Sequence, residues 1–489
     1  MNLVIVSNRL PFAVSRGEDG AWRVESGTGG LVTALRPVLR NRGGRWIGWS
    51  GATSEELPDS SAIFADSERR FGYSLIPVPL SAAERDGFYA GFSNEIVWPV
   101  FHDLIPLANF QPSYWAAYET VNERFADAVA AAAQPGDFVW VHDYHLMRVA
   151  TALSARRGDL RAAFFLHIPF PPLDVFLKLP WRFEVLNSLL DYSLVGFQTV
   201  RDRRNFVQCV RLLLPDVRVT GRGAVWKLKS GDRELRVGSF PISIDVAEFE
   251  RRAAEPGVAE KRDEIREAEA GRKIVLGIDR LDYTKGLPQK LEAFRTMLRQ
   301  HPEMRGTVTL MQVVVPSRED IPRYQEHKTL VDRLVGEING EFTRGDWAPI
   351  RYAHRSLEGV RLSAYYRAAD VALVTPLKDG MNLVCKEYVA SRIGGDGVLV
   401  LSEFAGAAAE LQSGALLVNP FDVEGVAEAL RAALLMPETE RRTRFRKLRR
   451  IVREHDIHRW LDTFLRAAAD HPLSDFPLVE DYLPAASAR

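Results

Sequence analysis

The chain has little cysteine, no excess of charge of either sign and no long apolar run. Two cysteines among 489 residues, Cys209 and Cys385, are too few for a disulfide framework and favour a reducing compartment. The 64 basic and 64 acidic side chains give a net charge of zero, which argues against binding nucleic acid through the whole surface. No stretch approaches about 18 apolar residues, so we expect no transmembrane helix. The N-terminal residues lack a signal-peptide pattern, and we therefore expect a cytoplasmic protein.

Motifs of several other enzyme classes are missing as well. The sequence has no Asp-x-Asp, the metal-bridging pair of metal-dependent sugar-nucleotide transferases. It has no Gly-x-x-x-x-Gly-Lys-[Ser/Thr] loop and no Gly-x-Ser-x-Gly nucleophile elbow. No Gly-x-Gly-x-x-Gly follows a strand, which disfavours an NAD-binding protein. We therefore expect no metal or other cofactor, and we expect the charge of any bound diphosphate to be met by Arg, Lys and helix dipoles.

Short apolar runs alternate with helix-period segments along the chain. Strands that are apolar on both faces belong to parallel sheets covered by helices, which predicts an α/β protein with two Rossmann-like domains. A charged helical stretch over 250–269 precedes a new strand, so we place the domain boundary near residue 245. We interpret residues 217–238 as a β-hairpin insert. The predicted strands are 3–6, 138–141, 163–167, 193–196, 274–277, 307–314, 371–375 and 397–401.

Two features of the first half are typical of a sugar-nucleotide site. A glycine cluster at 26–31 opens a helical pattern over 32–40, where backbone N–H groups can approach a diphosphate. An ordinary glycine-rich turn fits the same spacing. Trp49, Tyr89 and Trp98 stand beside small polar residues, and their flat rings suit the C–H face of a sugar. Packing in the core is the alternative for each of these rings.

Polar residues follow two predicted strands of this half. Asp143 and His167 stand at carboxyl ends of strands, where ligands bind in open α/β sheets. The alternative for Asp143 is a helix cap. His142 and His145 suggest a metal site only weakly, because no third ligand converges with them in the sequence.

The second half offers cations and carboxylates after its own strands. Arg280 and Lys285 can converge on a diphosphate, and the alternative is a surface ion pair with Asp279 or Asp282. Arg318 follows the next strand and is taken by itself as solvated. Asp379 lies at a turn before a helix and can accept sugar hydroxyls, while Glu387, about two helical turns further, can bind a ribose diol. The alternatives are a helix N-cap for Asp379 and a solvated face for Glu387.

Together these segments resemble the trehalose-6-phosphate synthases, retaining glycosyltransferases with the GT-B fold, from residue 4 to about residue 465. The segments that carry the resemblance are 7–9, 48–51, 92–94 with 98–99, 142–146, 166–171, 280–288, 379–384 with 386–388, and 401–406. The resemblance implies an acceptor-binding Rossmann-like domain over 1–245 and a nucleotide-sugar-binding one over 246–459. Their parallel sheets would face each other across a cleft, and a helix at about 460–480 would pack back on the first domain.

The resemblance implies transfer of glucose from UDP-glucose to glucose 6-phosphate, which gives trehalose 6-phosphate and UDP. It assigns the acceptor to Arg9, Trp49, Tyr89, Trp98 and Arg318. It assigns the donor to Gly30, His167, Arg280, Lys285, Asp379, Gly380, Met381, Asn382, Leu383 and Glu387. The residues expected to act in catalysis are Asp143, His167, Arg280 and Lys285. The expected partners are these small molecules and a functional link to a trehalose-6-phosphate phosphatase, with no membrane or nucleic acid, and a homo-oligomer stays open.

Retention of the donor's anomeric configuration needs two inversions or attack on the front face. Asp143 is the one carboxylate that we can name for a double inversion, and the resemblance places it nearer the acceptor. We therefore favour front-face transfer without a metal. Alternatives are a relative that uses glycerol 3-phosphate or a cyclitol phosphate, and a non-catalytic sugar-phosphate sensor. The donor base stays open between UDP, GDP and ADP, and we place its pocket near 351–356 and Leu383.

Overall fold

The computed structural model describes residues 2–16, 22–26, 32, 35–36, 39, 43–57, 59–221, 223–318, 321–476 and 478–484. The described residues form two compact units. The first comprises Met1–Pro241 and Trp460–Val479, and the second comprises Ile242–Arg459 with the C-terminal residues from Glu480. The sequence places the boundary at residue 245, four residues beyond Pro241. Both units are of the α/β class, and the predicted fold class is confirmed in that respect.

The first unit is built on a sheet that has nine strands in the described part of the chain. Its strands are mostly parallel, with β9 and β10 antiparallel at one edge. In spatial order they are β5 (Ser74–Pro77), β4 (Arg45–Trp49), β1 (Leu3–Arg9), β6 (Phe138–His142), β7 (Arg161–Phe165), β8 (Leu194–Phe197), β11 (Arg233–Ser239), β10 (Val225–Ser230) and β9 (Arg218–Thr220). Strands β2 (Phe12–Arg16) and β3 (Trp22–Ser26) form a separate hairpin.

Residues 217–238 are not the separate insert that the sequence suggests. Strand β11 pairs in parallel with β8, so it continues the main sheet, and β10 then folds back on it as its antiparallel neighbour. Strands β10 and β11 pair antiparallel from Val225–Gly238 to Ser230–Arg233, and this pairing explains the hairpin prediction. The interpretation as an insert is therefore wrong, although the hairpin itself is present.

Helices cover both faces of this sheet, and one π-helix carries part of the predicted site. The π-helix η1 (Arg85–Val97) runs directly into α5 (Trp98–Phe101). The other helices whose bounds lie within the described residues are α2 (Ser60–Phe64), α3 (Ser67–Phe71), α4 (Ala82–Glu84), η2 (Ile105–Leu107), α6 (Pro112–Ala132), η3 (Tyr144–Leu146), α7 (Val149–Arg156), α8 (Leu173–Phe176), α9 (Arg182–Leu190), α10 (Val200–Leu213), α20 (Ile457–Ala468) and η6 (Leu473–Asp475).

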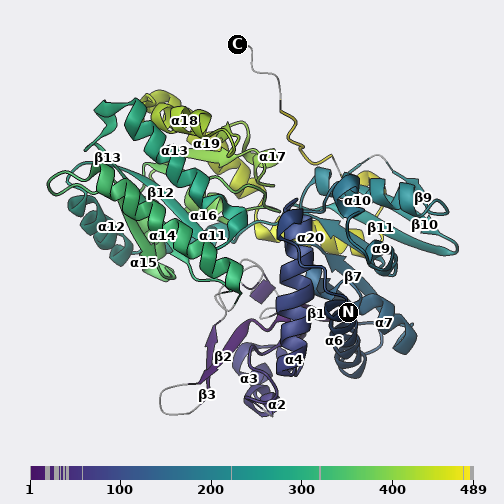
Figure 1. Cartoon of the computed structure of the whole chain (residues 1–489). Helices are drawn as coiled ribbons and strands as arrows, with labels where there is room; N and C mark the ends of the chain where they lie inside the picture. Colours follow the sequence, from purple (N-terminus) through teal and green to yellow (C-terminus); the bar gives the residue numbers. More distant parts are fainter. Residues whose placement is uncertain are drawn as a thin grey trace. The chain divides into compact units, whose positions relative to one another are not determined.

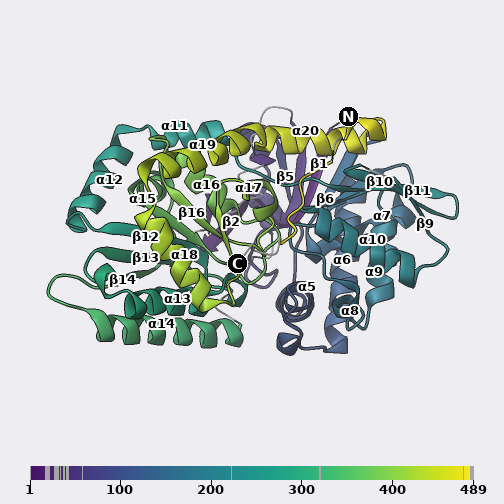
Figure 2. The ribbon, with the colours of Figure 1, turned by 90° about the horizontal axis from the view of Figure 1, so that it is seen from above.

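Helix α20, near the C-terminus, belongs to the first unit from Trp460 onward. Figure 2 shows α20 lying across strands of this unit. The ring of Phe464 stacks on Trp140 of β6 with centroids 4.3 Å apart, and Trp460 lies 5.1 Å from the same ring. Aromatic pairs of this kind contribute about 0.5–1.5 kcal/mol beyond their buried area. Helix α20 therefore completes the core of the first unit.

The second unit is built on a parallel sheet, with six strands among the described residues. In spatial order they are β14 (Ile350–His354), β13 (Val308–Val315), β12 (Lys273–Arg280), β15 (Val371–Val374), β16 (Val398–Ser402) and β17 (Leu416–Val418). Its helices are α11 (Val246–Ala253), α12 (Pro256–Ala268), η4 (Tyr283–Lys285), α13 (Leu287–Gln300), η5 (Pro302–Met304), α14 (Pro322–Phe342), α15 (Gly359–Ala368), α16 (Leu383–Ser391), α17 (Ala408–Leu411), α18 (Val423–Leu435) and α19 (Glu438–Glu454).

Helices cover the second sheet on both faces (Figures 1 and 2). Helices α13 and α14 lie on one face, where Phe294 and Leu298 join a core with Leu310 and Val314 of β13. Helices α12 and α15 lie on the other face. Strands buried on both sides read as continuous apolar runs, which is why these strands were recognisable in the sequence. Among the described helices, none combines the length and the apolar character that spanning a bilayer requires.

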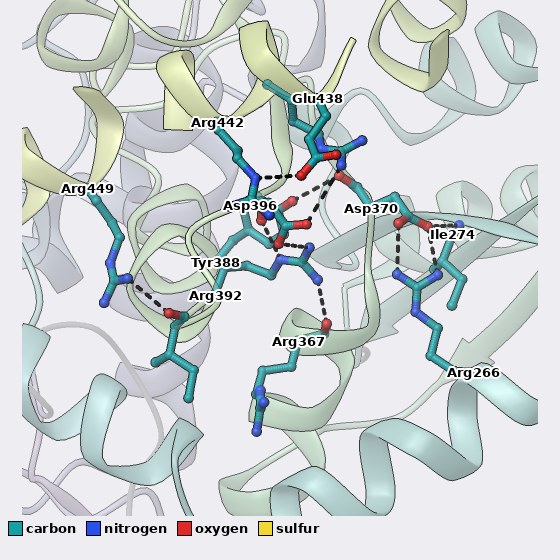
Figure 3. A network of polar contacts seen from close by, with 12 residues as sticks. Arg266, Ile274, Arg367, Asp370, Tyr388, Arg392, Asp396, Glu438, Arg442 and Arg449 are labelled. Atoms are coloured by element: carbon teal, nitrogen blue, oxygen red, sulfur yellow. Dashed lines mark hydrogen bonds and ion pairs between the residues drawn. The ribbon is translucent and has the colours of Figure 1, made fainter. Parts of the chain in front are cut away.

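A polar network joins helices to the amino ends of these strands (Figure 3). Asp370, just before β15, accepts two hydrogen bonds from Arg266 of α12 at 2.8 and 2.9 Å and a third from the backbone N–H of Ile274. Arg392, just after α16, donates to the carboxylate of Asp396 at 2.8 Å. Bidentate pairing of this kind fixes both partners in place. The network thus secures the end of the sheet opposite the strand ends at which the predicted donor residues lie.

Candidate functional site

Arg9 stands at the carboxyl end of β1 and lies over aromatic rings from two other elements. Its guanidinium carbon is 3.9 Å from the ring centroid of Trp49, at the end of β4, and 5.5 Å from that of Tyr89 in η1. The Trp49 and Tyr89 rings meet edge-on at 6.0 Å. Cations over aromatic faces are held electrostatically as well as by contact. The structure therefore brings three of the predicted acceptor residues together.

A glycine that the sequence reasoning passed over shapes this cluster. Gly51 has a φ of +103°, and a Cβ added there would lie 2.3 Å from Nη1 of Arg9. Only glycine combines that backbone angle with room for the guanidinium. The Gly-Trp-Ser-Gly segment, 48–51, carries part of the family resemblance, and the signal in the sequence is a glycine two residues after a strand. Gly51 is thus part of the arrangement that holds Arg9.

Trp98 belongs to the same region but is chiefly a core residue. Its side chain is 4% exposed, and its ring lies 5.7 Å from that of Tyr144. The Tyr144 hydroxyl donates to Asn94 Oδ1 at 3.0 Å, and Asn94 Nδ2 donates to the backbone carbonyl of Tyr89 at 2.7 Å. The π-helix makes this last contact possible, because it places Tyr89 and Asn94 one wide turn apart. Trp98 therefore supports the Arg9 cluster through Tyr144 and Asn94.

Asp143 follows β6 with a backbone that few residues adopt. Its φ of 73° and ψ of 167° lie in a region used almost only by glycine. The strain is held by two contacts to the next strand: its N–H donates to Phe165 at 2.8 Å, and its Oδ1 accepts the N–H of His167 at 3.2 Å. Its side chain makes no capping bond to the helix η3 that follows, so the helix-cap alternative is wrong. Strain of this kind clusters at active sites.

His167 lies two residues beyond the end of β7 and faces a second histidine. Its Nε2 is 3.1 Å from Nδ1 of His142, and its Nδ1 is 3.5 Å from the side-chain nitrogen of Gln198. Burial lowers the pKa of His167 to about 3 and lowers the pKa of His142 well below its ordinary value. Both rings are therefore neutral near pH 7. Within the described ranges, no three His, Cys, Asp or Glu side chains are grouped so that they could hold a metal ion.

In the second unit, cations gather around one buried carboxylate at the carboxyl ends of β12 and β13. Asp282 is fully buried, and its Oδ2 lies 3.3 Å from Nη1 of Arg318 and 3.9 Å from Nη2 of Arg280. Burial alone would raise the pKa of Asp282, but the charges of Arg318, Arg280 and Lys285 outweigh it and lower that pKa. Asp282 is thus the anion that keeps these cations together, and sequence reasoning considered it only as an alternative partner.

Lys285 connects this cluster to the loop before α16. Its ammonium lies 2.5 Å from Oδ2 of Asp379, and Asn382 donates to the same oxygen at 3.2 Å. The residue preceding α16 is Asn382, with a φ of 76°, so Asp379 is not its N-cap and that alternative is wrong. The run from Gly380 to Leu383 thus leads from the Asp379 carboxylate to the first backbone N–H groups of the helix.

Glu387 lies one turn inside α16 and is not on a solvated face. Its Oε2 accepts a hydrogen bond from the Tyr366 hydroxyl of α15 at 2.7 Å. Burial raises the pKa of Glu387, and the hydrogen bond from Tyr366 and the charge of Arg252 oppose that effect. The alternative of a solvated face is therefore wrong. Tyr366 was missed, because in the sequence it is one of two adjacent tyrosines on a helix.

A cavity of about 250 Å³ lies beside the segment where the donor base was expected. It is lined by Arg351, Tyr352, Ala353 and Arg355 of the β14 region together with residues of α12, β13 and α15. Leu383 is not among its lining residues. The place of the donor base therefore stays a prediction. Gly30 and most of the predicted 32–40 helix lie outside the described residues.

The predicted residues divide between the two units. Arg9, Trp49, Tyr89, Trp98, Asp143 and His167 lie in the first unit. Arg280, Lys285, Arg318, Asp379, Gly380, Met381, Asn382, Leu383 and Glu387 lie in the second unit. Arg318, which the resemblance assigns to the acceptor, is bonded to Asp282 among the cations that it assigns to the donor.

A family model described as glycosyltransferase family 20 matches residues 1–470. The chain belongs to this family. Family 20 membership confirms the resemblance found in the sequence, and with it the GT-B form of the α/β fold.

Two relatives in this family are similar over nearly the whole chain. A trehalose-6-phosphate synthase of Mycobacterium sp. is 46% identical over 96% of this chain and 96% of its own length. A bifunctional trehalose-6-phosphate synthase/phosphatase of Thermoproteus tenax is 45% identical over 95% of this chain, which spans 63% of that longer protein.

A solved structure is similar as well. It is the UDP-forming α,α-trehalose-phosphate synthase of Burkholderia xenovorans in complex with glucose 6-phosphate. It superposes with a TM-score of 0.86 at 35% identity, and the match covers 96% of this chain and all of the other.

Proposed function

We propose that this chain is a retaining glucosyltransferase that moves glucose from UDP-glucose to glucose 6-phosphate and forms α,α-trehalose 6-phosphate and UDP. The observation that carries the proposal is the set of cations around Asp282. Arg280, Lys285 and Arg318 gather at strand ends around the buried Asp282, and Lys285 also pairs with Asp379. Three cations thus face two carboxylates. The excess positive charge suits the diphosphate of a sugar nucleotide. The names of the family members support the choice of substrates.

The donor's diphosphate would be held by Arg280 and Lys285. An ammonium has three N–H donors, so Lys285 can keep its contact with Asp379 and still bind a phosphate oxygen. Arg280 is about half exposed and can turn its paired donors to the same group. The backbone N–H groups of Gly380, Met381, Asn382 and Leu383 approach the N-terminus of α16, where the helix dipole favours negative charge.

The glucose and ribose of the donor would meet carboxylates. Asp379 accepts one bond from Asn382 and one from Lys285, and a carboxylate has about four acceptor positions, so sugar hydroxyls can still bind. Glu387 would accept the ribose diol. His167 and Asp143 lie at adjacent strand ends of the first unit. By the family resemblance, His167 is assigned to the donor glucose, Asp143 to the acceptor and Gly30 to the donor diphosphate.

The acceptor's phosphate would be bound by Arg9, with its sugar beside Trp49, Tyr89 and Trp98. The Trp49 and Tyr89 rings fix the guanidinium plane, which leaves its outer N–H groups to form paired bonds with a phosphate. Arg318 is the second cation that the resemblance gives to this substrate. Its backbone φ of 52° is unusual for arginine. Its side chain is bonded to Asp282, so the direction of the guanidinium is fixed.

The reaction leaves negative charge on the departing UDP and positive charge on the anomeric carbon. Arg280 and Lys285 would stabilise the first charge. Fixed donors of this kind each lower the activation barrier by about 3–4 kcal/mol. In front-face transfer the leaving phosphate oxygen takes the proton of the acceptor hydroxyl, and the new bond forms on the same face. No metal is needed for that step. Asp143 would orient the acceptor hydroxyl rather than attack the donor carbon.

The wider setting follows from the same chemistry. The product is a sugar phosphate, so a phosphatase is the class of enzyme that would consume it, as the bifunctional relative suggests. We expect the chain to act in the cytoplasm, where both anionic substrates are found.

Arg280→Ala tests the proposal directly. The variant should lose at least about a hundredfold in kcat with UDP-glucose and glucose 6-phosphate, because a transition-state charge loses its partner. Arg299→Ala is the matched control, since Arg299 pairs with Glu341 on the surface of α13. Release of UDP is the readout. Equal turnover in the wild type and Arg280→Ala would overturn the assignment.

A further inference from the structure

Tyr366 is a buried tyrosine whose hydroxyl points at a residue of the proposed donor site. Its side chain is 1% exposed and sits on α15, and its hydroxyl donates to Oε2 of Glu387 on α16 at 2.7 Å. Its ring also meets Tyr388 edge-on, with centroids 6.5 Å apart. A buried hydroxyl needs a partner, and Glu387 is the partner that the structure gives it.

The carboxylate of Glu387 has one oxygen engaged. Among the described residues, the bond from Tyr366 is the one hydrogen bond recorded for this carboxylate, and no ion pair is recorded for it. A carboxylate that is held by one oxygen cannot rotate freely, so the position of the second oxygen, Oε1, is fixed as well. Holding a polar group in place before a ligand arrives reduces the entropy lost on binding.

The same bond also favours the ionised form of Glu387. Burial raises the pKa of this carboxyl, and the hydrogen bond from Tyr366 is the larger of the two effects that oppose the rise. A carboxylate accepts bonds from both hydroxyls of a diol, whereas a protonated carboxyl has lost part of its acceptor capacity. Tyr366 therefore acts both on the direction and on the ionisation of its neighbour.

We propose that Tyr366 is a positioning residue for the donor nucleotide, which fixes Glu387 so that its second carboxylate oxygen receives the ribose diol. The inference rests on the proposed function and adds to it a residue that acts only through Glu387. It predicts that the hydroxyl of Tyr366 influences the donor and not the acceptor.

Tyr388 of α16 provides a matched control. Its side chain is fully buried, and its hydroxyl donates to the backbone carbonyl of Asp370 at 3.2 Å, at the amino ends of the strands. Tyr388→Phe therefore removes one buried hydroxyl and one hydrogen bond, as Tyr366→Phe does, without removing a bond to Glu387.

The experiment compares Tyr366→Phe, Tyr388→Phe and Glu387→Gln in initial-rate kinetics with each substrate varied. Tyr366→Phe should raise the KM for UDP-glucose about tenfold, the usual effect of losing a hydrogen bond to a charged group. The KM for glucose 6-phosphate should stay unchanged. In the pH profile of kcat/KM for UDP-glucose, the acid limb should move to higher pH, because the pKa of Glu387 rises when the bond from Tyr366 is lost. The double variant should be no worse than Glu387→Gln.

A donor that lacks both ribose hydroxyls separates positioning from general loss of structure. With this donor, wild type and Tyr366→Phe should have the same KM. If Tyr366→Phe does not fold, difluorotyrosine at position 366 replaces it, and its stronger hydroxyl donor should move the acid limb to lower pH. An unchanged donor KM and acid limb, or equal effects of Tyr388→Phe, would overturn the inference. A wild type without turnover on UDP-glucose and glucose 6-phosphate would instead overturn the proposed function.

Discussion

Gly51→Ala should displace Arg9 while leaving the rest of the first unit in place. The added Cβ would lie 2.3 Å from Nη1 of Arg9, whereas ordinary contact begins at 3.4 Å, so the guanidinium must move by about 1 Å. A charge-assisted hydrogen bond contributes about 1.5–3 kcal/mol, and misplacement by about 1 Å can cost a hundredfold in rate. We therefore expect kcat/KM for glucose 6-phosphate to fall between about tenfold and a hundredfold.

The assay is initial-rate kinetics with glucose 6-phosphate varied at saturating UDP-glucose, and then the reverse. The KM for the acceptor should rise, and the KM for the donor should not change. Gly136→Ala is the matched control, because Gly136 has a φ of +84° and nothing lies within 4 Å of its added Cβ. Both substitutions strain the backbone, but only one meets Arg9. A normal acceptor KM in Gly51→Ala, or an equal loss in Gly136→Ala, would refute the reasoning.

Further predictions concern the buried titratable groups and the chemical step. The folded state keeps His142 and His167 neutral, so below pH 6.5 the unfolded chain binds protons that the folded chain does not, and stability falls as pH falls. Each histidine should cost about 2 kcal/mol between pH 7 and pH 5, so the melting temperature of His142→Asn should depend less on pH than that of the wild type. Asp282→Asn should destabilise the second unit by about 3 kcal/mol at neutral pH, because it removes the buried carboxylate that pairs with the charge of Arg318. The lowered pKa of Asp282 means that its stabilisation is present above about pH 4 and is lost as pH falls through the folded-state pKa, so the wild-type and variant melting temperatures should converge in acid. Incubation with a fluorinated UDP-glucose should leave no covalent sugar on Asp143 by intact mass, and a gain of one sugar mass would contradict front-face transfer.

Much of the fold could be predicted because parallel strands buried on both faces stand out in a sequence. The runs at 274–277 and 307–314 became β12 and β13, and the polar residues that follow them, Arg280 and Arg318, came together as strand ends do. The resemblance supplied the role of each residue, which the strand pattern alone left open.

What could not be predicted depends on contacts between distant segments. Gly51 matters because Arg9 of another strand lies where its Cβ would be. Tyr366 matters because α15 carries its hydroxyl to Glu387 on α16. The strained backbone of Asp143 is held by Phe165 and His167 of the next strand. None of these neighbours is visible from the local pattern. The strand β11 was taken for an insert for the same reason, since its pairing with β8 is not local.

The most direct test of the central claim is the structure of the product. The chain is supplied with UDP-glucose, GDP-glucose and ADP-glucose, each with glucose 6-phosphate, glycerol 3-phosphate or a cyclitol phosphate, and the products are identified by NMR. The account predicts α,α-trehalose 6-phosphate from UDP-glucose and glucose 6-phosphate, with the α configuration of the donor retained. A β-linked product, or faster transfer to another phosphorylated acceptor, would contradict it.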